Sequence, residues 1–327
     1  MDNVQKRIVF IGAGAIGTAL GNIIAEKENC DITLHSVESD VVDIINHSHL
    51  NPKYFPSIRL NPLLKATGKN VVLESADVIF LAIPSLVVID YLQRIQGYLN
   101  PKAILVNLAK GFGEGHMTIA ESLVTYFPNP VATLKGPSFA KDIINRIPTG
   151  MTLGYTDEEV KEVIAGIYTN TPVFLDFSHD MKGVELLSIL KNIYAIVLGI
   201  VDAQFDSPNI RFLFLTKAFK EMQRILLVFG GKEETLFNYC GYGDFTMTSL
   251  NDLSRNRTLG LLIGKGFFTE HVSHDLVLEG KIAANVFFEE ISRVRDVKLE
   301  FPIISELYKI LNHKYDISGF VNTVLKF

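Results

Sequence analysis

The sequence predicts an α/β protein in which an N-terminal, doubly wound parallel sheet is followed by an all-α C-terminal domain. Short apolar runs rich in β-branched residues alternate with helix-length segments over residues 1–179. From residue 180 onward the hydrophobic pattern is almost entirely helical. The chain has 327 residues, more than a single hydrophobic core usually spans. We therefore expect two domains, at residues 1–179 and 180–327.

The clearest local motif lies near the N-terminus, where a strand-like run leads into a glycine-rich turn and then a helix. Residues 7–11 (RIVFI) are followed by Gly12, Gly14 and Gly17 in a G-x-G-x-x-G pattern. In that context Gly12 allows a tight turn, Gly14 lets the backbone approach a pyrophosphate, and Gly17 lets helix and strand pack closely. The motif predicts a Rossmann-type dinucleotide site. A tight turn without a ligand is the alternative.

Further strands and helices are predicted downstream, with polar residues at the strand ends. The strands cover residues 31–36, 77–83, 103–107, 150–155 and 173–176, with one more ending near residue 135, and the helices 86–97, 117–126 and 156–169. Ligands bind beyond the carboxyl ends of parallel strands, so Ser85 and Lys110 are expected at a ligand site. Lys110 is equally well interpreted as a loop lysine. Ser138 suits a helix N-cap.

The residues after the second predicted strand bear on the choice of cofactor. They are Ser36, Val37 and Glu38, with no arginine among them. An acidic residue at this place favours the ribose 2′-hydroxyl of NAD, whereas an arginine favours the 2′-phosphate of NADP. We expect NAD or NADP as the cofactor, with NAD favoured.

The C-terminal half carries a lysine in the middle of a very apolar helix. Helices are predicted at residues 181–203, 209–228, 256–264, 270–273, 279–295 and 302–311. Lys191 lies within the first of them, beside a stripe of small and polar residues. A buried ammonium needs a carboxylate, a polar cluster or a ligand beside it, so Lys191 is a candidate catalytic acid. A lysine that reaches from a buried helix to solvent is the alternative.

A glycine-containing loop at residues 240–257 supplies the next candidates. Gly241 and Gly243 allow a tight turn that presents Asp244. Ser254 resembles an N-cap followed by arginines, although acidic residues are usual in a first helical turn. A helix N-terminus together with a guanidinium suits a phosphate, because both donate hydrogen bonds to its oxygens. A solvated basic turn is the alternative.

The overall composition narrows the classes of partner and compartment. The formal net charge is −5 and the basic residues are scattered, so we expect no binding to nucleic acid. Cys30 and Cys240 form no metal-binding or disulfide pattern, and we expect no metal. The first apolar run is too short for a signal peptide, and charges interrupt the apolar segment around Lys191. We expect a soluble, cytoplasmic protein without stable membrane insertion.

Several short stretches spread over nearly the whole chain form one combined pattern. They are GAGAIGTAL at 12–20, NPKYFP at 51–56, AIPS at 82–85, AKG at 109–111, GPSFAKD at 136–142, GVEL and LKN within 183–192, GYGDFTMTS at 241–249 and LSRNR at 253–257. In these stretches the chain resembles the NAD(P)-dependent glycerol-3-phosphate dehydrogenases. The resemblance implies reversible reduction of dihydroxyacetone phosphate to sn-glycerol 3-phosphate for glycerophospholipid synthesis, by a homodimer. The expected partner is a small phosphorylated three-carbon substrate.

The resemblance also implies roles for individual residues. Lys191, Asp244 and Lys110 would be catalytic. The substrate site would consist of Lys110, Gly136, Ser138, Lys191, Asp244, Ser254, Arg255 and Asn256. The cofactor would contact Gly12, Gly14, Ala15, Ile16, Gly17, Lys110, Ala140, Arg255, Val277 and Glu279. An ammonium near the substrate carbonyl would stabilise the charge that builds on its oxygen and supply a proton, and Asp244 would keep Lys191 charged.

Some positions depart from the family pattern, and other functions stay open. Ile16 stands where an aromatic residue is frequent, Val37 where arginine is frequent, and Leu250 where a small polar residue is common. Phe212 and Phe214 replace smaller residues. The alternatives are a related two-domain dehydrogenase that acts on another hydroxy acid or sugar phosphate, and a nucleotide-sensing protein without catalysis.

Overall fold

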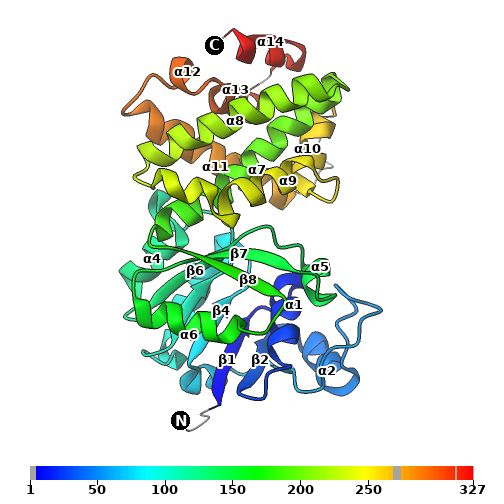
Figure 1. Ribbon diagram of the computed structural model, residues 1–327, viewed down its shortest axis with the longest axis vertical. Coiled ribbons are helices and arrows are strands. Elements are labelled where there is room, and N and C mark those ends of the chain that lie inside the picture. The colour runs from blue at the N-terminus through cyan, green and yellow to red at the C-terminus, as the bar shows by residue number, and fades with distance from the viewer. Residues whose placement is uncertain (1–4, 268–273, 314, 327) are drawn as a thin grey trace. The chain divides into compact units, whose positions relative to one another are not determined.

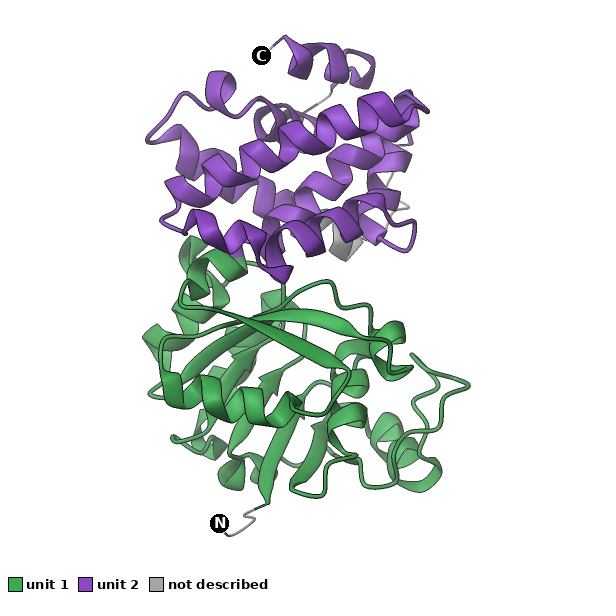
Figure 2. Ribbon diagram, viewed as in Figure 1, with its two compact units in different colours: residues 1–185 green, residues 186–327 purple. Residues whose placement is uncertain are grey.

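A computed structural model describes residues 5–267, 274–313 and 315–326, with only the backbone described for 274–279. The chain divides into two compact units, residues 1–185 and 186–327 (Figure 2). The domain boundary expected between residues 179 and 180 stays a prediction. Helix α7, Met181–Gln204, begins just after that position.

The first unit is built on an eight-stranded sheet with the order β3-β2-β1-β4-β5-β6-β7-β8. Its strands are β1 (Lys6–Ile11), β2 (Cys30–His35), β3 (Lys65–Thr67), β4 (Val78–Leu81), β5 (Ile104–Asn107), β6 (Val131–Lys135), β7 (Thr149–Gly154) and β8 (Val173–Ser178). Neighbouring strands are parallel, except that β6 and β7 are antiparallel. The predicted doubly wound sheet is confirmed with that one correction. Hydrophobic patterning locates a buried strand but does not encode the direction of its neighbour.

Helices cover both faces of this sheet (Figure 1). They are α1 (Ala15–Ile24), α2 (Ser39–Ser48), α3 (Val88–Ile95), α4 (Ile119–Tyr126), α5 (Ala140–Ile144) and α6 (Glu158–Tyr168), with short 3₁₀ turns at Asn70–Ser75, Ser85–Val87, Gln96–Tyr98 and Glu114–His116. Successive residues of β1 feed two separate cores: Ile8 and Phe10 belong to one, Val9 and Ile11 to the other. This alternation, with both faces apolar, is what makes a strand central in a doubly wound sheet.

The second unit is helical, as predicted. Its helices are α7, α8 (Pro208–Val228), α9 (Asp244–Leu250), α10 (Arg255–Gly264), α11 (His274–Ser292), α12 (Val297–Glu300), α13 (Pro302–Asn312) and α14 (Phe320–Leu325), with 3₁₀ turns at Glu233–Phe237 and Ile317–Gly319 and a π-helical turn at Tyr239–Gly243. The short helices α9, α12 and α14 were not expected, because they are too brief to show a helical period. The helix expected at 270–273 falls outside the described residues.

Helix α7 is the central element of the helical unit. It is long and apolar enough to cross a membrane, yet 94% of its most apolar window is buried inside the protein. A core helix passes the same test of length and composition, because burial inside a protein selects the same residues. Its close crossing with α10 depends on glycine: a Cβ on Gly199 would lie 2.2 Å from the carbonyl oxygen of Arg257. The two backbones are therefore in direct contact.

Candidate active site

The glycine-rich turn of the first unit has the backbone geometry that its motif predicts. Gly12 follows β1 with a φ of +113°, and a Cβ there would lie 2.5 Å from the Ala82 carbonyl oxygen. A Cβ on Gly17 would lie 2.3 Å from the Gly12 carbonyl oxygen. A Cβ on Gly14 would meet only an ordinary contact at 4.0 Å. The first and third glycines are thus required by packing, while the second leaves an open approach to the backbone.

Helix α1 presents its free backbone amides at this turn. Gly14 is the N-cap and Ala15 the first helical residue, so the amides of Ala15, Ile16 and Gly17 precede the first intrahelical bond, which Thr18 donates to Gly14. Such an N-terminus attracts a pyrophosphate. The buried Asn51 side chain braces the turn, because its Nδ2 donates to the Ala13 carbonyl oxygen at 2.9 Å.

A cavity of about 350 Å³ opens beside this turn and the ends of β2 and β4. Its lining includes Ser36, Glu38 and Tyr54. Glu38 forms an ion pair of 3.0 Å with Lys53. Burial lowers the pKa of His35, which favours the neutral ring at the cavity wall, and its Nε2 lies 3.0 Å from Asn70 Oδ1. The turn, the free amides and this cavity fit a bound dinucleotide.

Lys110, Gly136 and Ser138 lie together at the ends of β5 and β6. Lys110 Nζ lies 3.4 Å from the Gly136 carbonyl oxygen, to which Ser138 Oγ donates at 2.9 Å. Gly136 has a φ of +155°, and a Cβ there would lie 2.7 Å from the Gly150 carbonyl oxygen. The N-cap interpretation of Ser138 is wrong. Phe139 is the N-cap of α5, because Ser138 is already engaged with the preceding turn.

The structure describes three other expected cofactor contacts, Ala140, Val277 and Glu279, only in part. Ala140 is the first residue of α5, a helix that packs against α1 beside the glycine-rich turn. Val277 and Glu279 fall outside the residues whose side chains the structure describes. Ser85 is close to the AKG stretch, because a Cβ on Gly111 would lie 2.3 Å from Ser85 Oγ.

Lys191 is buried in the second unit and paired with a carboxylate. Its side chain is 5% exposed, and Nζ forms an ion pair with Oδ1 of Asp244, whose side chain is fully buried. Nζ also donates to Thr248 Oγ1 at 3.1 Å. Asp244 begins α9 and Thr248 lies one turn later, so one short helix supplies both partners. The alternative of a lysine that reaches solvent is wrong, and the expected ion pair is confirmed.

The N-terminus of α10 is organised as the sequence predicts. Ser254 is the N-cap, and its hydroxyl accepts a hydrogen bond from the Arg257 amide. The Arg255 side chain is exposed and Asn256 is half-buried. Arg257 instead points inward and pairs with Asp202 of α7. Arg255 is therefore available to an anion, whereas Arg257 anchors the helix.

Known proteins match this chain along almost its full length. The family profile described as NAD-dependent glycerol-3-phosphate dehydrogenase N-terminus matches residues 7–161, and the profile of the C-terminus matches residues 180–322. A glycerol-3-phosphate dehydrogenase [NAD(P)+] of Clostridium botulinum is 30% identical over 316 residues, which are 95% of this chain and 94% of the relative. The enzyme of the same name from Desulfovibrio desulfuricans is 34% identical over 311 residues, which are 93% of this chain and 92% of the relative.

The chain belongs to this family of glycerol-3-phosphate dehydrogenases. A solved glycerol-3-phosphate dehydrogenase structure, from Coxiella burnetii, supports the assignment. It superposes with a TM-score of 0.90 at 28% identity and covers 99% of this chain and 100% of that one. Proteins of this family use NAD or NADP as the cofactor, and the glycine-rich turn and cavity of the first unit fit such a dinucleotide.

Two residues that depart from the family pattern lie in different environments. Phe214 is fully buried and packs against Phe320, with ring centroids 6.1 Å apart. It therefore belongs to the core of the helical unit. Phe212 is 55% exposed on α8. Of this pair, Phe212 alone has the exposure that contact with a small ligand requires.

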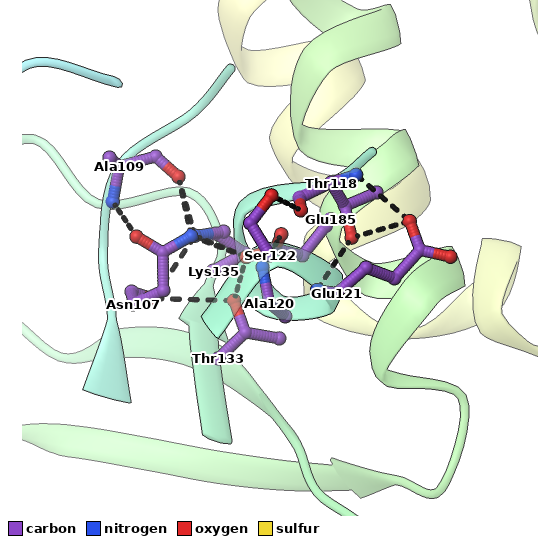
Figure 3. Close-up of polar contacts among 9 residues, drawn as sticks. All are labelled: Asn107, Ala109, Thr118, Ala120, Glu121, Ser122, Thr133, Lys135 and Glu185. Atoms are coloured by element: carbon purple, nitrogen blue, oxygen red, sulfur yellow. Dashed lines mark hydrogen bonds and ion pairs between the residues drawn. The ribbon is translucent and has the colours of Figure 1, made fainter. Parts of the chain in front are cut away.

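Sequence reasoning missed a buried charge cluster at the ends of β5 and β6 (Figure 3). Lys135 is fully buried, and its Nζ lies 3.3 Å from Oε1 of Glu185, which is 1% exposed. The signal was a lysine at the end of a predicted strand, directly before Gly136. Among the described residues, no group of three or more His, Cys, Asp or Glu side chains is arranged to hold a metal ion.

Proposed function

We propose that the protein catalyses the reversible NAD(P)H-dependent reduction of dihydroxyacetone phosphate to sn-glycerol 3-phosphate. The relatives named above carry this activity in their names, and the chain covers more than nine-tenths of each. The observation that carries the proposal is the buried ion pair of Lys191 and Asp244, with Thr248 beside it. A charged amine on a rigid, buried helix is suited to act on a carbonyl group.

The chemistry of ketone reduction explains why such an amine is needed. When bound, the nicotinamide cofactor supplies the hydride. Negative charge then builds on the substrate oxygen, and the Lys191 ammonium would stabilise that charge and donate a proton to it. Asp244 would keep Lys191 protonated and oriented, and it offsets the cost of burying the ammonium. Thr248 would hold the amine in one position.

The substrate phosphate would bind at the N-terminus of α10. Ser254 ends the preceding loop there, and Arg255 and Asn256 occupy the first turn of the helix. Backbone amides and a guanidinium together suit a dianion. Phosphate binding away from the reacting carbon orients the ketone and contributes to the rate. Lys110, Gly136 and Ser138 are proposed as further substrate contacts.

The cofactor and cellular setting complete the proposal. The amides of Ala15, Ile16 and Gly17 would hold the pyrophosphate, and Glu38 favours NADH. Ala140, Arg255, Val277 and Glu279 are proposed as further cofactor contacts. We propose a cytoplasmic homodimer without stable membrane insertion or nucleic-acid partners, whose product enters glycerophospholipid synthesis.

Replacement of Lys191 tests this assignment directly. We expect Lys191→Met to lower kcat with dihydroxyacetone phosphate by about 10²–10⁴-fold, while the Kd of NADH changes less than twofold. Lys182→Met is the matched control. Lys182 lies on the same helix and pairs with Glu121 at 2.8 Å, but its side chain is 40% exposed. Near-normal turnover by Lys191→Met would refute the catalytic role, and an inactive wild-type protein would refute the proposed function.

A further inference from the structure

Lys135 is a lysine that the proposed chemistry leaves unused. It is the last residue of β6, and its side chain is fully buried. Its Nζ donates to the Asn107 carbonyl oxygen at 3.0 Å and to the Ala109 carbonyl oxygen at 2.6 Å. Because the ammonium is enclosed by protein, it does not contact a substrate itself. The role of Lys135 therefore lies in the backbone and side-chain groups that its ammonium binds.

The negative charge that balances Lys135 comes from Glu185 in the first turns of α7. Oε1 of Glu185 lies 3.3 Å from Lys135 Nζ and accepts a hydrogen bond from Thr133 Oγ1 at 2.8 Å. Oε2 accepts from the Ala120 amide of α4 at 2.8 Å (Figure 3). A buried ion pair is a weak source of stability, because desolvating both charges offsets their attraction. Such a pair is better explained by the geometry that it imposes.

The two carbonyl groups held by Lys135 both belong to the segment that leads from β5 to Lys110. Asn107 ends β5, and Ala109 directly precedes Lys110. The segment is also tied to itself, since the Ala109 amide donates to Asn107 Oδ1 at 2.9 Å. The backbone of Lys135 continues into Gly136, whose carbonyl oxygen lies 3.4 Å from Lys110 Nζ. The Lys135 ammonium thus holds the segment that leads to Lys110. The Lys135 backbone leads to Gly136, which lies on the other side of the Lys110 amine.

We propose that Lys135 is a positioning residue that sets the place of Lys110 and Gly136 in the substrate site. This inference rests on the proposed function, which assigns Lys110 to the substrate. A charged lysine can hold two carbonyl oxygens and a carboxylate at once, because an ammonium has three donors in roughly tetrahedral directions. A methionine of similar length fills the same space and holds none of them.

The first test compares Lys135→Met with a matched lysine. Lys27 is the control, because its Nζ also donates to two backbone carbonyl oxygens, those of Gly166 at 2.8 Å and Thr169 at 2.9 Å, at the end of α6. We expect Lys135→Met to raise KM for dihydroxyacetone phosphate at least tenfold and to leave the Kd of NADH within twofold. Lys27→Met should change neither quantity. An unchanged KM in Lys135→Met overturns the proposal.

A second variant separates positioning from simple charge balance. Lys135→Met leaves Glu185 buried without its cation, which alone could unfold the protein. The double variant Lys135→Met/Glu185→Gln removes both charges. Its one amide oxygen can still accept from the Ala120 amide, while the Thr133 hydroxyl keeps the Asn107 carbonyl oxygen as an acceptor at 3.2 Å. We expect the double variant to regain most of the wild-type Tm while KM stays at least tenfold raised. Recovery of both Tm and KM would overturn the proposal, because Lys135 would then serve only to neutralise Glu185.

Hydrogen exchange gives a readout that does not depend on activity. In the double variant we expect the amides of residues 108–112 to exchange at least tenfold faster than in the wild-type protein, with unchanged exchange in α6. Unchanged exchange at 108–112 overturns the positioning role. A wild-type protein that fails to reduce dihydroxyacetone phosphate would refute the proposed function, and the exchange result would still decide whether Lys135 holds this segment.

Discussion

Gly199 and Gly260 meet where helices α7 and α10 cross. A Cβ on Gly199 would lie 2.2 Å from the Arg257 carbonyl oxygen, and one on Gly260 would lie 2.0 Å from the Ile196 carbonyl oxygen. No side chain separates the two backbones at this point. Helix α10, which begins at the proposed phosphate-binding turn, is therefore held directly against α7, the helix that carries Lys191.

Gly199→Ala is expected to disturb this crossing. The added methyl group would strike backbone atoms, which cannot move aside as a flexible side chain can, so the helices must separate. We expect the free energy of unfolding to fall by about 1–3 kcal/mol and KM for dihydroxyacetone phosphate to rise. Urea denaturation and steady-state kinetics measure both quantities. Gly166→Ala in α6 is the control, since its Cβ would meet nothing within 4 Å. An unchanged free energy of unfolding in Gly199→Ala would contradict the close contact of the two helix backbones.

Arg255 provides a test of the phosphate site. Arg255→Gln removes the exposed guanidinium at the start of α10, and a charge-assisted hydrogen bond is worth about 1.5–3 kcal/mol. We therefore expect KM for dihydroxyacetone phosphate to rise about 10–100-fold, while turnover of unphosphorylated dihydroxyacetone changes little. Arg94→Gln, which removes an exposed arginine paired with Asp90 on α3, is the control. An equal loss with both ketones would place Arg255 outside the phosphate site.

Structural features were predicted most accurately from the sequence where a motif requires one local backbone geometry. The glycine pattern of residues 12–17 belongs to a motif with one backbone geometry, the N-cap at Ser254 depends on residues next to it in the chain, and both were predicted correctly. The pairing of Lys191 with Asp244 was also predicted, although 53 residues separate them. It followed from the family resemblance and from the cost of burying an unpaired ammonium.

Contacts between distant strands were not predictable in the same way. Lys135 finds its partners on β5 and α7, and no local pattern of residues indicates which strand will lie beside β6. The antiparallel direction of β7 was not predictable for the same reason, because the hydrophobic pattern of a buried strand is the same whichever way the strand runs. Ser138 shows the opposite error: its type and place suited an N-cap, but its hydroxyl bonds the Gly136 carbonyl oxygen instead.

Glu38 is expected to control the choice between NADH and NADPH. Its carboxylate lines the cavity at the end of β2 and holds Lys53 at 3.0 Å. Glu38→Gln would remove a negative charge that repels a 2′-phosphate and release a lysine that attracts it. We expect the ratio of kcat/KM for NADPH to that for NADH to rise about tenfold, a free-energy change of about 1.4 kcal/mol.

The cofactor experiment needs a binding measurement as well as rates. Calorimetry with ADP-ribose and its 2′-phosphate should show the same change in ratio as the kinetics. The control is Glu26→Gln, which breaks a surface ion pair with Arg146 just beyond the C-terminal end of α1. If the preference stays the same in Glu38→Gln, the choice of cofactor is made elsewhere in the cavity.

Glu221 makes the stability of the helical unit depend on pH. It is buried on α8 and accepts hydrogen bonds from the Ile303 and Ile304 amides at the start of α13, at 3.0 Å and 2.8 Å, and from Tyr194 Oη at 2.9 Å. Desolvation outweighs these donors and the nearby charge of Arg224, and it raises the pKa of Glu221 from 4.5 to about 7. The folded protein therefore binds this proton more tightly than the unfolded chain does.

The sign of the pH effect follows from that difference. The stabilisation by the bound proton is complete below the unfolded pKa of 4.5 and is lost as pH rises through about 7. We expect the free energy of unfolding of the wild-type protein to fall by about 3 kcal/mol between pH 4.5 and 8 relative to Glu221→Gln, which does not titrate there. Urea titrations of both proteins across this range measure the difference. Parallel pH profiles would mean that Glu221 stays ionised when folded, with its three donors outweighing its burial.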